Sequence, residues 1–139
     1  KLLKYSKQIA TDSLAISDRS YTSAVADDLE SEWFLYSGDI IPTSRCFCIE
    51  RHDKHFYYKE IESWGRGENL GECNIGDGRW AGENEATNEQ TIYNFAGGYI
   101  CNHSILPVTI DQVPVEVIRE AMSKWGFVPT NMDIQELGI

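Results

Sequence analysis

Two short segments carry the side chains of this sequence that are best suited to chemistry. Cys46 and Cys48 form a Cys-x-Cys pair, and Cys101 and His103 form a Cys-x-His pair much later in the chain. Thiolates and imidazoles are the ligands of structural zinc, which usually takes four of them in a tetrahedron. The sequence therefore offers Cys46, Cys48, Cys101 and His103 as a metal site, with Cys73 as an alternative ligand.

The segment around Gly97-Gly98 presents the second pair. The two glycines allow a positive φ or a close approach to another segment. If the chain continues from them as a strand, Tyr99, Cys101 and His103 share one face, because side chains alternate along a strand. The same pattern fits a strand packed on the core, with the Cys and the His bonded locally. This segment alone therefore does not decide whether the protein binds a metal.

The Cys46-x-Cys48 pair has two interpretations. In a strand, both thiols point to one face and can hold one ion. In a helix capped by Thr43 or Ser44, they lie roughly 200° apart, and only one of them points inward. In the helix, Phe47, Cys48 and Arg51 would be neighbours.

Residues 1–32 are predicted to be helical, with Ser, Thr and Asp breaking the segment near 11–13 and 17–20. In a helix over 22–32, Tyr21, Val25 and Leu29 recur at i, i+4 and i+8, which predicts an apolar packing stripe. The acidic side chains between them would face water.

After Trp33, the spacing changes to short aromatic runs separated by turns, which predicts strands near 33–36, 55–58, 91–95 and 99–106. A short helix over 59–64 and a long Gly-rich loop over 65–89, anchored by Trp80 and Thr87, lie between them. Pro114 opens a C-terminal helix, Gly126 ends it, and residues 127–139 form a tail. The expected fold class is α+β: N-terminal helices packed on a small, mostly antiparallel sheet, a long Gly-rich loop and a C-terminal helix.

The chain divides into residues 1–32, an α+β core over 33–110 that contains the loop 65–89, and residues 111–139. Large apolar side chains in these segments form the predicted core. They are Trp33, Phe34, Phe47, Phe56, Ile61, Trp64, Ile92, Phe95, Tyr99 and Ile105.

Composition limits the partners. The 139 residues suffice for one domain, and their formal net charge of −10 argues against direct binding to nucleic acid, which needs clustered Lys and Arg. An acidic surface suits solubility or a basic protein partner, and a solvated face is the interpretation that we favour. We expect no membrane segment, and because the chain begins with Lys1, we expect it to be part of a larger protein or assembly.

With these segments placed, the sequence resembles the C-terminal part of phage and prophage minor head proteins, the head-morphogenesis group related to the Mu F protein. The resemblance covers residues 20 to 120, and the order and spacing of its motifs carry it. These are Glu32-Trp33-Phe34-Leu35-Tyr36-Ser37-Gly38, Thr43-Ser44-Arg45-x-Phe47-Cys48, Glu60-Ile61-x-x-Trp64, Trp80-x-Gly82, Ala86-Thr87, Thr91-Ile92 and Gly97-Gly98-Tyr99-x-Cys101-x-His103-x-x-x-Pro107-Val108.

The resemblance implies a virion structural protein: a minor head component near the portal that acts in capsid assembly and in genome packaging or ejection. Other head or portal proteins would be its partners, and the virion, or the host cytoplasm during assembly, its location. The sequence departs from the family pattern at Cys46, at Asn102 and at Cys73.

The resemblance also implies that Cys48 and Cys101 lie close together, because they end paired motifs of one pattern. Three states are open to them: buried thiols without a cofactor, a zinc site with His103 and one further cysteine, or a disulfide. We rank them in that order, because proteins assembled in a reducing cytoplasm rarely rely on disulfides.

Two alternatives to a purely structural role remain. A small zinc-binding interaction module would use the four ligands named above. A nuclease-like or other hydrolytic domain would use His, Glu and Cys side chains for acid–base and nucleophilic work, but no motif with catalytic spacing is present. Its candidates are His52, His55, His103, Glu60, Glu62, Cys48 and Cys101.

Overall fold

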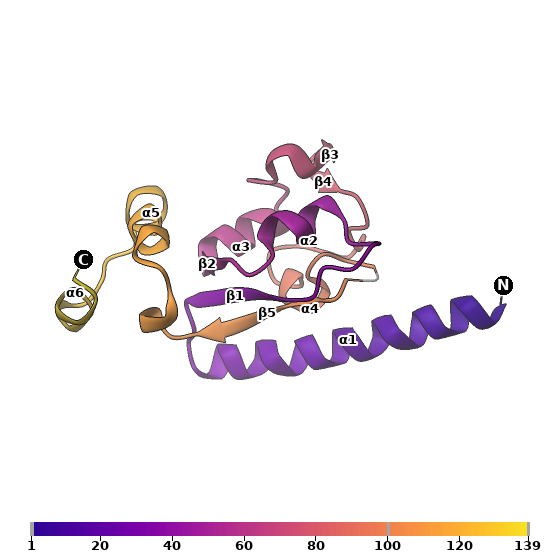
Figure 1. The fold of residues 1–139 in the computed structure, drawn as a ribbon, viewed down its shortest axis with the longest axis horizontal. Helices are drawn as coiled ribbons and strands as arrows, with labels where there is room; N and C mark the ends of the chain where they lie inside the picture. Colours follow the sequence, from indigo (N-terminus) through magenta and orange to yellow (C-terminus); the bar gives the residue numbers. More distant parts are fainter. Residues whose placement is uncertain (1, 100, 139) are drawn as a thin grey trace.

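The chain folds as an α+β protein in the computed structural model (Figure 1), which describes residues 2–99 and 101–138, with side chains from residue 14 onward. The predicted fold class is confirmed. The elements in chain order are α1 (Leu2–Asp28), β1 (Trp33–Gly38), α2 (Cys46–Arg51), β2 (His55–Tyr57), α3 (Tyr58–Gly65), a 3-10 turn η1 (Gly71–Cys73), β3 (Asn74–Gly76), β4 (Arg79–Trp80), α4 (Ile92–Phe95), β5 (His103–Val108), η2 (Ile110–Gln112), α5 (Val115–Trp125) and α6 (Asn131–Leu137).

The sheet at the centre is antiparallel, with strand order β2-β1-β5. Trp33 of β1 lies opposite Tyr57 on one side and Val108 on the other. The strands predicted at 33–36 and 55–58 are therefore confirmed, whereas the strand predicted over 99–106 begins only at His103. A separate pair, β3 and β4, lies inside the Gly-rich loop.

The strand predicted over 91–95 is wrong, because this segment forms the short helix α4. Asn88 starts the helical turn: its side-chain oxygen accepts the backbone N–H groups of Gln90 and Thr91. Its carbonyl then accepts the N–H of Ile92. Local side-chain bonds of this kind override a strand-like run of apolar residues.

One uninterrupted helix, α1, replaces the broken helices expected before Trp33. Ser20, one of the residues expected to break it, instead donates to the Ile16 carbonyl within the helix, and Thr22 likewise donates to that of Asp18. The predicted packing stripe is also wrong. Tyr21 is 75% exposed and Leu29 is 69% exposed, and Arg19 and Ala26 occupy the buried side of the helix instead.

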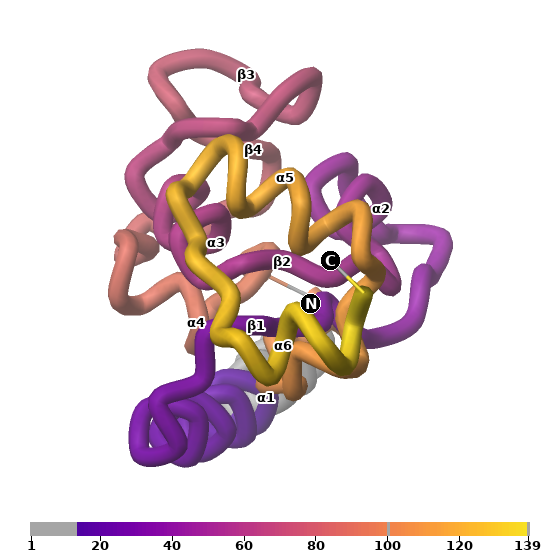
Figure 2. Tube along the Cα trace, turned by 90° about the vertical axis from the view of Figure 1, so that its left-hand side faces the viewer, coloured from indigo at the N-terminus to yellow at the C-terminus, as the bar shows by residue number. Residues whose placement is uncertain are grey.

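The helices lie around the sheet in a simple arrangement. In Figure 1, α1 runs along one side of the molecule beside β5 and α4, while α2 and α3 lie on the opposite side of β1. In Figure 1, α5 and α6 lie at the left-hand end of the molecule, and in Figure 2, which is viewed from that end, they lie in front of the sheet; α5 packs on β2. None of the described helices has both the length and the apolar character that a membrane span requires.

The core consists of two groups of buried side chains. The larger lies around Phe47 and Trp64, and the smaller joins Trp33 and Tyr57 to α5. Of the ten predicted core residues, Tyr99 is a clear error: it is 44% exposed, because the strand begins beyond it. Phe56 and Phe95 are half-buried, and the remaining seven are buried.

A disulfide joins Cys46 at the start of α2 to Cys73 in η1. It connects the Gly-rich loop to the body of the protein, together with the two predicted anchors, Trp80 and Thr87, which are buried. The long loop is therefore attached at several points.

Trp64→Ala should strongly destabilise the fold. Trp64 is 1% exposed, and its ring makes edge contacts with the rings of Phe47 and Phe56. Truncating a buried Trp typically lowers the free energy of unfolding by about 3–5 kcal/mol. Urea unfolding measures this, with Ile75→Ala, at a position 69% exposed, as the near-neutral control. An equal effect of both variants would contradict the packing described for α3.

Removing the disulfide should also destabilise the chain. Cys46 and Cys73 are 27 residues apart, and the chain-entropy model gives about 3–4 kcal/mol for a loop of this length. We expect Cys46→Ser/Cys73→Ser to melt at a lower temperature than the oxidised wild type. If the oxidised wild type has no bond between these two cysteines in a peptide map, the assignment fails.

Candidate functional site

Cys48, Cys101 and His103 converge at one point in the structure. The two sulfur atoms are 3.4 Å apart. One ligand atom of each of the three residues lies within 4.8 Å of the others. The expected closeness of Cys48 and Cys101 is therefore seen, and three of the four predicted metal ligands are brought together.

Cys46 does not join this group, because the second interpretation of the Cys-x-Cys pair is the correct one. Residues 46–51 form α2, so Cys48 faces the core while Cys46 points away and is bonded to Cys73. Both cysteines offered as a fourth ligand are thus in a disulfide, and in this state neither sulfur is a thiolate. The expected four-residue ligand set needs correction to Cys48, Cys101 and His103.

Gly97 lets the backbone reach this cluster. A Cβ on Gly97 would lie 2.4 Å from the Cys48 sulfur and 3.1 Å from that of Cys101. Gly98 has a φ of +102°, and its N–H donates a hydrogen bond to the Phe95 carbonyl. The paired glycines therefore do both things expected of them, close approach and a positive φ.

Tyr36 of β1 completes the inner wall of the site. Its hydroxyl lies 3.2 Å from the Cys48 sulfur and 3.7 Å from the Cys101 sulfur. Its ring stacks on the His103 ring, with centroids 5.0 Å apart and the planes 17° from parallel. Burial is the main reason that the pKa of Tyr36 is raised, so this phenol is neutral at ordinary pH.

Arg19 of α1 binds the backbone of the segment that carries Cys101 and His103. The side chain is 4% exposed, and its guanidinium donates to the carbonyls of His103 at 3.0 Å and Cys101 at 2.7 Å. Longer contacts reach the carbonyls of Asn94 and Phe95. Among the described residues, no carboxylate forms an ion pair with Arg19. The charge therefore binds the backbone that carries Cys101 and His103.

A second histidine, His52, contacts the ring of His103. Nδ1 of His52 lies 2.8 Å from Nε2 of His103, and Nε2 of His52 lies 3.5 Å from a carboxylate oxygen of Asp53. His103 is 1% exposed, and its other nitrogen, Nδ1, has no hydrogen-bond partner among the described residues. One nitrogen of a buried imidazole is thus bonded, and the other is not.

The two thiols differ in acidity. The hydrogen bond from Cys48, followed by the nearby His103 side chain, the charge of Arg19 and the His103 backbone N–H, lowers the pKa of Cys101. The hydrogen bond to Cys101, burial and the nearby charge on Cys101 raise the pKa of Cys48. Cys101 is therefore the thiol of the pair that ionises first.

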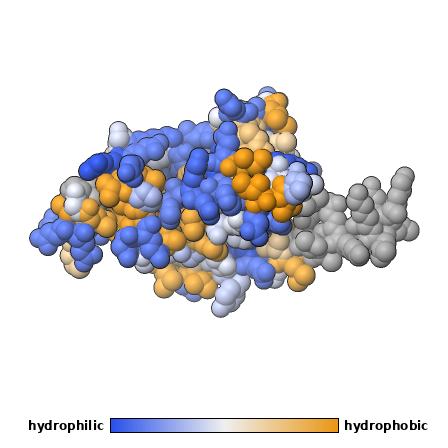
Figure 3. All heavy atoms as spheres, viewed as in Figure 1, coloured by the Kyte–Doolittle hydropathy of each residue, from blue (hydrophilic) through white to orange (hydrophobic). Residues whose placement is uncertain are grey.

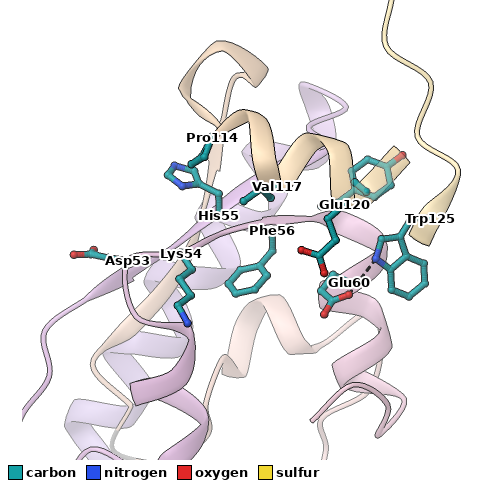
Figure 4. A pocket seen from close by; sticks show the side chains of 11 residues that line it. Asp53, Lys54, His55, Phe56, Glu60, Pro114, Val117, Glu120 and Trp125 are labelled. Carbon is teal, nitrogen blue, oxygen red and sulfur yellow. Dashed lines mark hydrogen bonds between the residues drawn. The ribbon is translucent and has the colours of Figure 1, made fainter. Parts of the chain in front are cut away.

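A separate pocket of about 280 Å³ lies between β2, α3 and α5 (Figure 4). His55 and Pro114 lie at one end of the pocket, and Glu60 and Trp125 lie at the other. Phe56 and Val117 lie between the two ends. Glu60 accepts hydrogen bonds from Trp125 and Lys124, both at 3.0 Å. The predicted acid–base candidates His55 and Glu60 therefore share a pocket without converging, and the cysteine cluster does not line it.

Sequence reasoning missed three residues that build the cluster: Arg19, Tyr36 and His52. Arg19 stands in a run of Ser and Asp that resembles a helix break, and Tyr36 in an aromatic run that indicates only a core strand. The residue type of His52 indicates an acid–base group, and nothing near it in the sequence indicates a partner of His103. No local pattern joins these residues, because the sheet and α1 bring them together.

Comparison of the chain with protein-family models, with curated proteins and with solved structures finds no match.

Arg19→Met should destabilise the fold while preserving the length of the side chain. It removes two short bonds to carbonyls, and hydrogen bonds to a charged group are worth about 1.5–3 kcal/mol each. We expect the free energy of unfolding in urea to fall by at least about 2 kcal/mol. Arg119→Met, on the exposed side of α5, is the matched control with an expected change below about 0.5 kcal/mol. Equal effects would contradict the role of Arg19.

Proposed function

We propose that this chain is a structural component of a phage head: a minor head protein near the portal that acts in capsid assembly and in genome packaging or ejection. It works through contacts with other head or portal proteins rather than by catalysis. Its location is the virion, and the host cytoplasm during assembly.

The observation that carries this proposal is the apolar stripe along the outer side of α1. Leu14, Tyr21 and Leu29 are each more than two-thirds exposed, and Val25 lies between the last two at 37%. Their spacing of seven, four and four residues places them along one side of a helix. Apolar side chains gathered on an exposed helix face mark an interaction surface.

A neighbouring head protein is the occupant that we assign to this stripe. The opposite side of α1 is already used, because Arg19 and Ala26 pack against the body of the protein. On the face shown in Figure 3, hydrophobic residues form several patches among hydrophilic ones, including patches along the lower edge where α1 runs in Figure 1. A helix that is packed on one side and apolar on another suits a subunit of an assembly.

Two further features support a structural role. The residues that carry the resemblance to minor head proteins include some of the most deeply buried ones, such as Phe47, Trp64, Ile92 and His103. The Cys46–Cys73 disulfide also suits a protein that leaves the cell in a virion, because virion surfaces are oxidising surroundings. The low rank given to a disulfide concerned Cys48 and Cys101, and the bond in the structure joins the other two cysteines.

The proposal predicts that charge on the stripe blocks incorporation into heads. Tyr21→Asp and Val25→Asp should lower the amount of this chain in assembled heads at least about tenfold, since desolvating a carboxylate at an apolar contact costs more than one tenfold step in binding. Heads purified on a density gradient from cells that also produce the other head proteins are quantified by mass spectrometry.

Ala24→Asp is the matched control, because it adds the same charge to an exposed position of α1 outside the stripe. The melting temperature of each variant shows that the fold is intact. Absence of the wild-type chain from purified heads would contradict the proposed function. Normal incorporation of the two stripe variants would contradict the proposed surface.

A further inference from the structure

We propose that Cys48, Cys101 and His103 bind one zinc ion that fastens α2 to the backbone leading into β5. The site is independent of the phage proposal, since it rests on the geometry of the folded chain alone. Two thiolates and a neutral imidazole are typical zinc ligands. The three residues come from segments that are far apart in the sequence, so a bound ion would cross-link the fold.

The spacing of the sulfurs fits a shared ion better than a disulfide. Two thiolates that bind one tetrahedral zinc at about 2.3 Å are roughly 3.8 Å apart, whereas bonded sulfurs are about 2.05 Å apart. The observed separation of Cys48 and Cys101 is 3.4 Å. These sulfurs are held close to the metal-binding distance.

The unbonded nitrogen of His103 is the second and independent observation. Buried polar atoms almost always have a partner, and Nδ1 of His103 has none among the described residues. Nε2 of the same ring already contacts His52. A zinc ion bound at Nδ1 would supply the missing partner without disturbing the other contact.

The contact with His52 is the kind that supports a ligand histidine. Metal-binding imidazoles usually donate their second N–H to another group, which fixes the tautomer and the ring orientation. With Nδ1 of His103 on the metal, Nε2–H of His103 donates to Nδ1 of His52. Nε2–H of His52 then points toward Asp53, 3.5 Å away. All three residues can take these protonation states together.

The charges around the site also balance. Two thiolates neutralise Zn²⁺, so Arg19 faces a neutral group through the carbonyls of Cys101 and His103 rather than a bare cation. Binding releases the Cys48 proton to solvent, because the site already favours a thiolate at Cys101. The neutral Tyr36 hydroxyl, placed beside both sulfurs, donates a hydrogen bond to the thiolates rather than binding the ion.

Metal analysis of the whole chain, purified anaerobically without chelator, tests this proposal. We expect one zinc per chain, and cobalt(II) in its place should give the sulfur-to-cobalt absorption and the strong visible bands of a tetrahedral thiolate site. Cys101→Ser should abolish both signals. Cys46→Ser/Cys73→Ser should keep them, because these cysteines lie outside the ligand set.

His52→Gln separates metal support from simple folding. It leaves the three ligands in place and should weaken zinc binding about 10–100-fold in competition with a chromophoric chelator. The circular dichroism of each variant shows whether it is folded. A folded wild-type chain that binds no zinc would overturn the proposal. So would a Cys101→Ser variant that keeps its zinc, or a Cys48–Cys101 disulfide in the anaerobically purified protein.

Discussion

The buried guanidinium of Arg19 is the contact on which the rest of the structure depends. An unpaired charge is expensive to bury, and in this protein backbone carbonyls on both sides of the Gly97-Gly98 turn solvate it. In return, the carbonyls of Phe95, Cys101 and His103 each accept a hydrogen bond from a charged donor. The hydrogen bonds of this one side chain join α1 to the end of α4 and to the start of β5. This contact also explains why α1 lies along this side of the sheet although Leu14 and Tyr21 face away from it.

The position of the segment that carries Cys101 and His103 in turn determines the chemistry of the cysteines. Arg19 holds the Cys101 backbone, Gly97 removes the side chain that would keep Cys48 at a distance, and Tyr36 closes the far side. The positive charge, together with the hydrogen bond from Cys48, favours a thiolate at Cys101. A thiolate in reach of a second thiol and an unbonded imidazole nitrogen is the starting point of a soft-metal site. The reactivity of the thiols therefore follows from how a helix is packed some distance away.

The sequence predicted the fold class and part of the site, and each failure has a definable cause. Aromatic runs such as Trp33 to Tyr36 indicate strands, because few structures other than a strand can bury several large consecutive side chains. The period of Tyr21, Val25 and Leu29 identified an apolar helix face but could not say what covers it. The pairing of Cys46 with Cys73 depends on where a long loop returns, which no local pattern encodes. The roles of Arg19 and His52 likewise depend on contacts across the fold.

The pitch of α2 gives the four cysteines two separate roles. Because two residues of helix turn the side chain by roughly 200°, Cys46 and Cys48 cannot bind the same ion. Cys46 reaches the loop and Cys48 reaches the core, so each thiol has its own partner from elsewhere in the chain. Oxidation of the outer pair then leaves the inner pair free to bind a metal. A Cys-x-Cys motif on a helix thus stabilises two different segments, one covalently and one through the cluster around His103.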